Sequence, residues 1–196
     1  FFWAITNHLD KYLLSRYVRG GGVGALIIFS CLFAALALPI IAFLQPATLA
    51  VAPIQIAILL GVGVLNTLGV LCYLYALEED EASIVVPLFQ LIPVFGFIFG
   101  YILLNETISV REASGSMLII AGAVLLGIDF KTSFRIKGRM LLYMLGSGVF
   151  FGLHGALFKM IAIEENFWLA SFWEYAGLLV SGLLLLATVG TYSRQF

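Results

Sequence analysis

Ionisable and amide side chains interrupt a chain that is otherwise strongly apolar. The segment ITNHLDKYLL places Asn7, His8, Asp10 and Lys11 within five positions. Farther along, His154 lies well inside a charge-free run. Such groups can bind a polar solute or carry a proton, and each is costly inside a membrane. Each is therefore a candidate functional residue, provided that the surrounding helices cross a bilayer.

The composition indicates a membrane protein. Hydrophobic residues make up 62% of the 196 residues and charged residues 11%, against about half and about a quarter in soluble domains. The net charge is −1 and the few charges form short clusters, so no nucleic-acid partner is expected. Cys31 and Cys72 lack metal-ligand spacing, and no enzyme motif is found. We therefore expect no metal, no cofactor and no enzymatic activity.

Long apolar runs define the expected helices. About 20 apolar residues cross about 30 Å of hydrocarbon. Residues 1–14 are interpreted as the second half of a helix, so the chain is expected to be a fragment with seven transmembrane helices. The absence of period-two alternation favours helices over barrel strands, which predicts an all-α polytopic membrane protein. The complete charge-free runs cover residues 20–44, 54–77, 82–105, 113–128, 140–158 and 175–193.

Short signals predict how these helices begin and pack. Ser109 and Glu112 have the S-x-x-E spacing of a capping box, which would open the fifth helix. GxxxG spacing, which favours close helix packing in membranes, occurs at Gly96 and Gly100 in the fourth helix and again at Gly148 and Gly152 in the sixth.

Residues 1–11 align weakly with residues 149–159, and the alignment pairs Lys11 with Lys159. Because the offset spans five helices, a second copy would be inverted in the membrane, as in many secondary transporters. The expected organisation is two inverted five-helix repeats, with ten helices in the intact protein. The first repeat would cover residues 1–130, a basic linker residues 131–139 and the start of the second repeat residues 140–196.

Residues 76–126 resemble the core of an EamA domain of the drug/metabolite transporter superfamily. The first helix adds Trp3 and a terminal cation at Lys11 to this resemblance. It implies an integral membrane protein, expected in the bacterial inner (plasma) membrane, that exports amino acids, metabolites, drugs or sugar derivatives, and fold analogy cannot choose among these. The residues that carry the resemblance are Ala76, Ala82, Ser83, Pro87, Pro93, Gly100, Glu106 and Gly115.

In the first helix, Asn7, Asp10 and Lys11 fall in one stripe with helical spacing. The stripe either lines a pathway or pairs with another helix, and Lys11 has the alternative of snorkelling to headgroups. In the third helix, Asn66 and Tyr73 are seven residues apart and so share one side. They are candidates for a cavity wall, and an interhelical hydrogen bond is the plainer interpretation of Asn66.

In the fourth helix, Gln90 lies three residues from both Pro87 and Pro93. Because a proline frees a backbone carbonyl, which lipid tolerates only beside protein or water, this helix is expected to face inward. Gln90 then presents an amide to a substrate or ties the helix to a neighbour.

His154 in the sixth helix either faces a cavity and couples a proton or is a neutral histidine bonded to a neighbouring helix. Glu174 lies among aromatic residues at the expected start of the seventh helix and is interpreted as interfacial. Lys159 repeats the boundary position of Lys11. The full set of candidate pathway residues is Trp3, Asn7, His8, Asp10, Lys11, Asn66, Tyr73, Gln90, Pro93, His154 and Lys159.

The leading hypothesis is a secondary transporter, or permease, that moves a small metabolite such as an amino acid by alternating access. A multidrug or nucleotide-sugar carrier is an alternative of the same class, and a non-transporting membrane scaffold or lipid-processing enzyme is an alternative of another class. The expected partners are a small-molecule substrate, the lipid bilayer, a coupling proton or exchanged solute, and a second copy in a homodimer. The distribution of positive charges places the start of the first helix outside, whereas the resemblance implies a cytoplasmic N-terminus.

Overall fold

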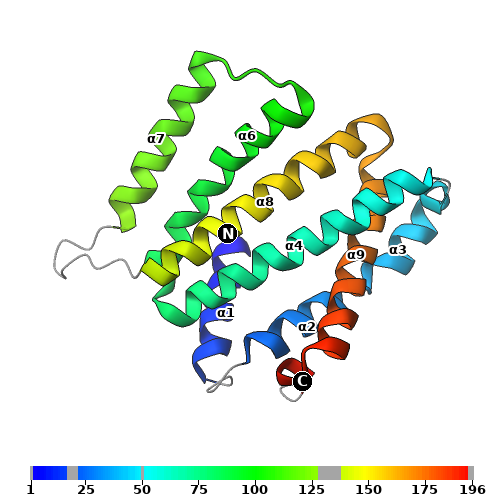
Figure 1. Ribbon diagram of the computed structural model, residues 1–196, viewed down its shortest axis with the longest axis horizontal. Helices are drawn as coiled ribbons and strands as arrows, with labels where there is room; N and C mark the ends of the chain where they lie inside the picture. The colour runs from blue at the N-terminus through cyan, green and yellow to red at the C-terminus, as the bar shows by residue number, and fades with distance from the viewer. Residues whose placement is uncertain (1, 17–21, 50, 128–137, 194–196) are drawn as a thin grey trace. The chain divides into compact units, whose positions relative to one another are not determined.

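The computed structural model describes residues 2–16, 22–49, 51–127 and 138–193. Every regular element within these ranges is helical, as the absence of period-two alternation predicted. The chain divides into two compact units. Unit 1 comprises residues 1–20 and 69–152, and unit 2 comprises residues 21–68 and 153–196. The two longest helices, α4 (Pro53–Glu79) and α8 (Gly138–Glu164), each contribute one part to each unit (Figure 1).

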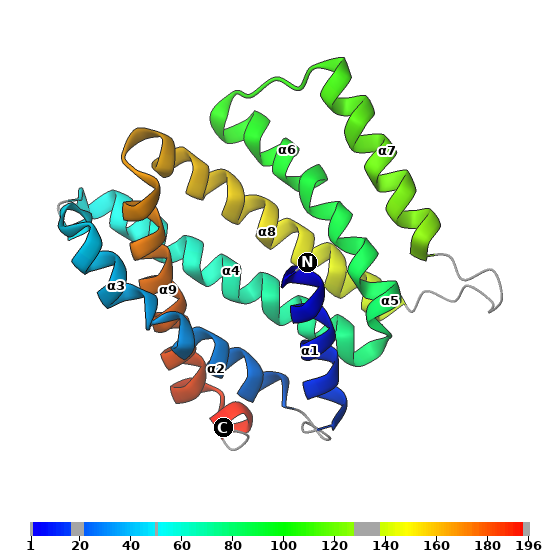
Figure 2. The ribbon, with the colours of Figure 1, turned by 180° about the vertical axis from the view of Figure 1, so that it is seen from behind.

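Unit 1 also contains α1 (Phe2–Arg16), α5 (Ala82–Val85), the 3-10 helix η2 (Val86–Gln90), α6 (Leu91–Leu104) and α7 (Val110–Gly127). In both ribbon views, α6 lies between α7 and α8 (Figures 1 and 2). A Cβ atom on Gly152 would lie 2.6 Å from the Cβ of Phe95, and one on Gly148 would lie 2.9 Å from the Phe95 ring. Gly148 and Gly152 therefore let α6 approach α8, as their spacing predicted, whereas Gly96 faces open space.

Prolines divide the expected fourth helix. Pro87 lies in η2, and α6 begins only at Leu91. Pro93 is thus in the first turn of α6, where backbone N–H groups have no partner within the helix and a missing N–H costs little. The helix ends after Leu104, because Asn105 adopts a left-handed conformation with φ of 53° and the Glu106 N–H donates to the Gly100 carbonyl at 3.2 Å.

The predicted capping box at the start of α7 is confirmed. The Glu112 N–H donates to Ser109 Oγ at 3.3 Å. In return, the Ser109 N–H and hydroxyl donate to Glu112 Oε2 at 2.9 and 2.7 Å. The cap therefore satisfies N–H groups that the first turn of any helix leaves without an intrahelical partner.

Unit 2 also contains α2 (Val23–Ala34), α3 (Ala37–Leu44), the 3-10 helix η1 (Pro46–Leu49), α9 (Phe167–Thr188) and α10 (Gly190–Ser193). Both ribbon views show α9 lying against α2 and α3 (Figures 1 and 2). The single run expected at 20–44 is split because Pro39 has no N–H for the Ala35 carbonyl, which instead accepts from the Leu38 N–H at 3.2 Å. Leu59, Ile161, Leu169 and Ala170 form a buried apolar cluster.

The last helix begins before the charge-free run at residues 175–193. Helix α9 begins at Phe167, where the Asn166 side chain accepts the Trp168 N–H at 2.8 Å and caps the first turn. Glu174 was expected near the start of this helix. It lies about 10 Å along α9, at about 1.5 Å per residue.

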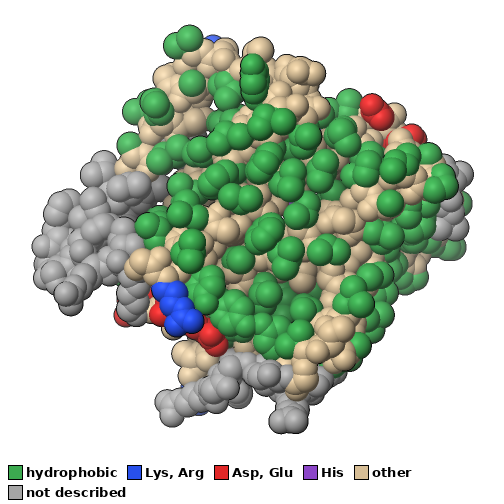
Figure 3. Space-filling model, viewed as in Figure 1, with side chains coloured by type: hydrophobic (Ala, Val, Ile, Leu, Met, Phe, Trp, Pro, Cys, Tyr) green, Lys and Arg blue, Asp and Glu red, His purple; other side chains and the backbone are tan. Residues whose placement is uncertain are grey.

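Within the described residues, five helical segments are long and apolar enough to cross a membrane. The helices α1 and α7 are not among them, so the count of seven transmembrane helices and the inverted repeat stay predictions. Hydrophobic side chains cover most of the described surface that faces the viewer in Figure 3, and charged side chains lie near its margins. The predicted basic linker, residues 131–139, lies almost wholly outside the described residues. The five segments are Val23–Leu44, Pro53–Glu79, Ala82–Leu104, Gly138–Glu164 and Phe167–Thr188.

Candidate functional site

Three polar side chains from three candidate membrane spans meet in unit 2. Asn66 on α4 donates its Nδ2 amide to Glu174 Oε1 on α9 at 3.0 Å. His154 Nε2 on α8 lies 2.7 Å from the same oxygen. Asn66 is 13 residues from either end of the 27-residue helix α4, so this contact occurs about midway along a span. We call Asn66, His154 and Glu174 the carboxylate cluster.

Glycines position the carboxylate cluster. A Cβ atom on Gly63 would lie 2.6 Å from the backbone carbon of Gly177, and one on Gly177 would collide with the Leu60 carbonyl. The backbones of α4 and α9 therefore touch at this crossing, as small residues allow in membrane helices. Asn66 follows Gly63 by about one turn and Glu174 precedes Gly177 by about one turn, which brings the amide to the carboxylate.

The carboxylate cluster is only partly enclosed. The side chain of His154 is 20% exposed and that of Glu174 is 13% exposed. The His154 ring stacks on Phe158, with 6.2 Å between centroids and 17° between planes. Among the described residues, no lysine or arginine forms an ion pair with Glu174, and His154 is its only ionisable partner. A partly buried carboxylate without a lysine or arginine partner can take up a proton or a cationic group.

A second group of polar side chains lies in unit 1. The Tyr73 hydroxyl on α4 donates to Asn7 Oδ1 on α1 at 3.0 Å, and the Asp10 carboxylate interacts electrostatically with this hydroxyl. Asn7 is 5% exposed, and its Nδ2 amide is buried without a partner among the described residues. The Tyr73 ring packs on Phe89 at 4.8 Å between centroids. We call Asn7, Asp10 and Tyr73 the tyrosine cluster.

Lys11 connects α1 to the end of α4. Its ammonium group donates to the Leu77 carbonyl at 2.7 Å and to the Asp80 carbonyl at 2.9 Å. These oxygens belong to the C-terminal turn of α4 and the residue after it, where carbonyls lack helical partners and the helix dipole favours a cation. Lys11 thus binds the end of α4, and its interpretation as a membrane-boundary residue stays a prediction.

The other predicted pathway residues lie apart from these clusters. His8 on α1, Pro93 on α6 and Lys159 on α8 are exposed, and Gln90 is half-buried just before α6. Trp3 belongs to α1, and its side chain lies outside the described residues.

Glu174 is the site residue that the sequence interpretation missed. It was assigned to the membrane interface because the aromatic residues around it resemble a belt at the level of the lipid headgroups. Asn166 was the available signal, because asparagine before an apolar segment is a typical helix start. A helix that begins there contains Glu174, and a carboxylate inside a span is a candidate functional residue.

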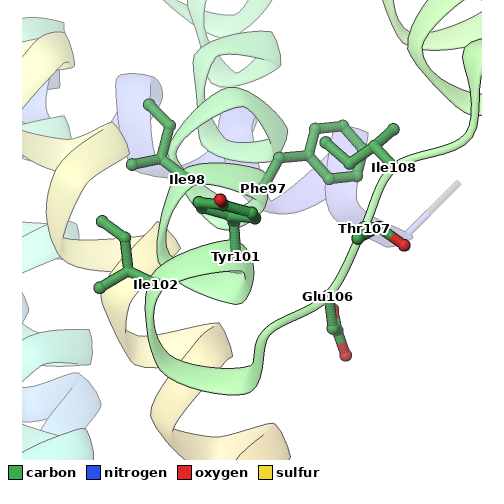
Figure 4. Close-up of a pocket in the computed structure, with 7 residues that line it drawn as sticks. All are labelled: Phe97, Ile98, Tyr101, Ile102, Glu106, Thr107 and Ile108. Carbon is green, nitrogen blue, oxygen red and sulfur yellow. The ribbon is translucent and has the colours of Figure 1, made fainter.

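A groove of about 640 Å³ lies where α6 turns toward α7 (Figure 4). Its lining is apolar except for the Glu106 carboxylate and the hydroxyls of Tyr101 and Thr107. The groove includes no member of the carboxylate or tyrosine cluster. In the part of the chain that the structure describes, no three His, Cys, Asp or Glu side chains are grouped as a metal site. The remaining lining residues are Phe97, Ile98, Ile102 and Ile108.

Comparisons with known proteins cover part of the chain. A model of the EamA-like transporter family matches residues 1–128. An uncharacterized protein of Methanocaldococcus jannaschii is 40% identical over 66 residues, which are 34% of this chain and 48% of that protein. The chain thus spans about half the length of this curated relative. No solved structure matches the chain.

Proposed function

Because the chain belongs to the EamA-like transporter family, we propose that it is a secondary transporter that moves a small metabolite by alternating access. The family and the apolar helices make it an integral membrane protein. The substrate class that we favour is an amino acid or a related amino compound. A location in the bacterial inner membrane, a coupling proton or exchanged solute, and a homodimer belong to the same proposal.

The carboxylate cluster is the observation that carries this proposal. Asn66, His154 and Glu174 come from three different candidate spans, and their contacts lie within those spans. Ionisable groups at such positions are costly and typically mark a substrate or ion pathway. Small residues and neutral hydrogen-bonding side chains are enough to hold membrane helices together, so an ionisable carboxylate and imidazole within the spans favour a pathway over a scaffold.

Breaks in two of the candidate spans support the same function. The Val23–Leu44 segment is interrupted between α2 and α3, and the Ala82–Leu104 segment contains η2. Discontinuous helices in transporters supply backbone groups near the binding site and allow local movement. Both breaks follow from prolines in otherwise apolar runs.

The experiment is a flux measurement with the purified protein in liposomes. Labelled amino acids, sugars and organic cations are offered with and without a proton gradient. The expected result is uptake of at least one solute above that of protein-free liposomes. A protein that carries none of them in either condition is not a transporter of this kind, and a scaffold or lipid-processing enzyme would then be favoured.

A further inference from the structure

We propose that the carboxylate cluster binds the primary ammonium group of an amine, and that this ammonium group and a proton occupy the cluster in turn. The inference rests on the proposed function, to which it adds the chemical group of the substrate and the ion exchanged for it. It concerns Asn66, His154 and Glu174, which all belong to unit 2.

Unused acceptor atoms make the cluster suitable for an ammonium group. Both contacts of Glu174 use Oε1, and its Oε2 accepts no hydrogen bond within the described ranges. Asn66 uses its Nδ2 as donor, which leaves its Oδ1 as a second acceptor. An ammonium group has three N–H donors, and the 13% exposure of the Glu174 side chain leaves a route to the carboxylate.

A proton or another cation would neutralise the Glu174 carboxylate. An unpaired carboxylate in an apolar interior is strongly disfavoured, and the described residues supply no lysine or arginine to Glu174. One proton shared by Glu174 and His154 makes the pair neutral. When an ammonium group enters, that proton leaves to water, His154 is neutral, and the carboxylate and ammonium charges cancel. The net charge of the occupied cluster is zero in both states, so one amine exchanges for one proton.

The elements packed on α9 carry few other titratable groups. The helices α2 and α10 contribute the Cys31 thiol and the Tyr192 phenol, which lie against Thr67 and Gly24 respectively, whereas α3 and η1 contribute none. The segment of α4 in unit 2 contributes none. The remaining titratable residues of α8 and α9 in unit 2 are the exposed Lys159 and Glu164 and the half-buried Tyr175. The exchange is therefore assigned to Glu174 and His154.

Aromatic neighbours suggest which amine to use as a probe. Phe158 stacks on His154 and contacts the Phe167 ring at 5.9 Å between centroids. A ligand with an apolar ring beside its ammonium group would match this surface. Benzylammonium has this form, and benzyl alcohol is a neutral analogue of nearly the same size.

The test is proton release from the purified protein in detergent. Benzylammonium is titrated into weakly buffered protein while a soluble pH indicator and calorimetry report protons and binding. We expect about one proton released per amine bound, and an affinity that falls about tenfold for each unit by which the pH is lowered. Benzyl alcohol should release none. Binding of benzylammonium without proton release, or with equal affinity across this pH range, would overturn the proposal.

Variants locate the exchange. Glu174→Gln should bind benzylammonium about 10- to 100-fold more weakly, because a charged acceptor is lost, and should release no proton. Glu164→Gln removes an exposed carboxylate from α8 and should behave as wild type. If Glu174→Gln does not fold, the wild-type comparison of the two probes still decides the question. Proton release that persists in a folded Glu174→Gln variant would contradict the assignment.

Failure of this inference can be distinguished from failure of the transport function. Proton release without flux of any solute in liposomes would support the binding site and contradict the transport function. If a solute is transported and Glu174→Gln does not change its flux, the transport function is supported and the proposed site is contradicted.

Discussion

Gly63 on α4 and Gly177 on α9 meet at a crossing where a Cβ on Gly63 would lie 2.6 Å from the Gly177 backbone. The crossing lies about one helical turn from Asn66 and from Glu174. Hydrophobic driving force between helices is absent in lipid, so close backbone contact and interhelical hydrogen bonds must hold such a pair. The Gly63–Gly177 contact therefore brings the Asn66 amide to the Glu174 carboxylate, and their hydrogen bond in turn helps to hold the two helices together.

Gly63→Ala should separate α4 from α9, because the added methyl meets only backbone atoms, which cannot move aside independently. We expect a loss of about 1–3 kcal/mol in the free energy of unfolding, as in other overpacked sites. The measurement is unfolding in a mixed-detergent titration. Gly61→Ala is the matched control, because nothing lies within 4 Å of its added Cβ. It should be neutral or stabilising by up to about 1 kcal/mol, and equal losses at the two positions would contradict the crossing.

Tyr73→Phe should destabilise unit 1, because it removes the donor to Asn7 Oδ1 and leaves the whole Asn7 amide buried without a partner. The expected loss is about 1–3 kcal/mol, the usual penalty of an unsatisfied buried polar group. The same unfolding titration measures it. Tyr101→Phe, at a position that is 64% exposed, should change little. Adding Asn7→Leu to Tyr73→Phe should recover part of the loss, and no recovery would show that the hydrogen bond is not its cause.

Lys11→Met should loosen the end of α4 while keeping most of the apolar stem of the side chain. The two carbonyls of Leu77 and Asp80 lose their cationic donor, which is worth about 1 kcal/mol at a helix C-terminus. Hydrogen exchange at the Asp80 amide, which donates to the Ala76 carbonyl, should then be about fivefold faster. Lys11→Arg should restore much of the protection. Unchanged exchange in Lys11→Met would exclude the capping role.

Glu112 should titrate below its ordinary pKa of 4.5, because Ser109 donates side-chain and backbone hydrogen bonds to its carboxylate. It lies before the apolar run that begins at residue 113 and is outside the five candidate membrane spans. Since the folded pKa is the lower one, this cap stabilises α7 above pH 4.5 and is lost as the pH falls through the folded value. Carboxyl-carbon NMR should show the pKa of Glu112 rising toward 4.5 in Ser109→Ala. A pKa that is the same in both proteins would contradict the cap.

Much of the fold was predictable because length and apolar composition determine where a membrane helix can lie. The run at 54–77 corresponds to α4 at Pro53–Glu79, and the S-x-x-E spacing gave the start of α7 correctly. The breaks at Ala35 and in η2 were not predicted. Each depends on which carbonyl a nearby proline leaves without a donor, and a count of apolar residues carries no such information.

The candidate site was predictable only in part. Asn66 and His154 stood out as polar residues inside apolar runs, and the interhelical hydrogen bond preferred for Asn66 is present. Their shared partner Glu174 was missed, because the aromatic residues around it were interpreted as a belt at the membrane interface. The pairing itself depends on the Gly63–Gly177 crossing between helices distant in sequence, and no local spacing reveals that contact.

The most direct test of the central claim is the initial rate of solute uptake by proteoliposomes that contain the wild-type protein, Glu174→Gln or Glu164→Gln. A transporter that uses the carboxylate cluster should carry at least one amino compound above the protein-free background. That rate should fall at least about tenfold in Glu174→Gln and stay unchanged in Glu164→Gln. Wild-type protein that moves no solute, with or without a proton gradient, would contradict the claim.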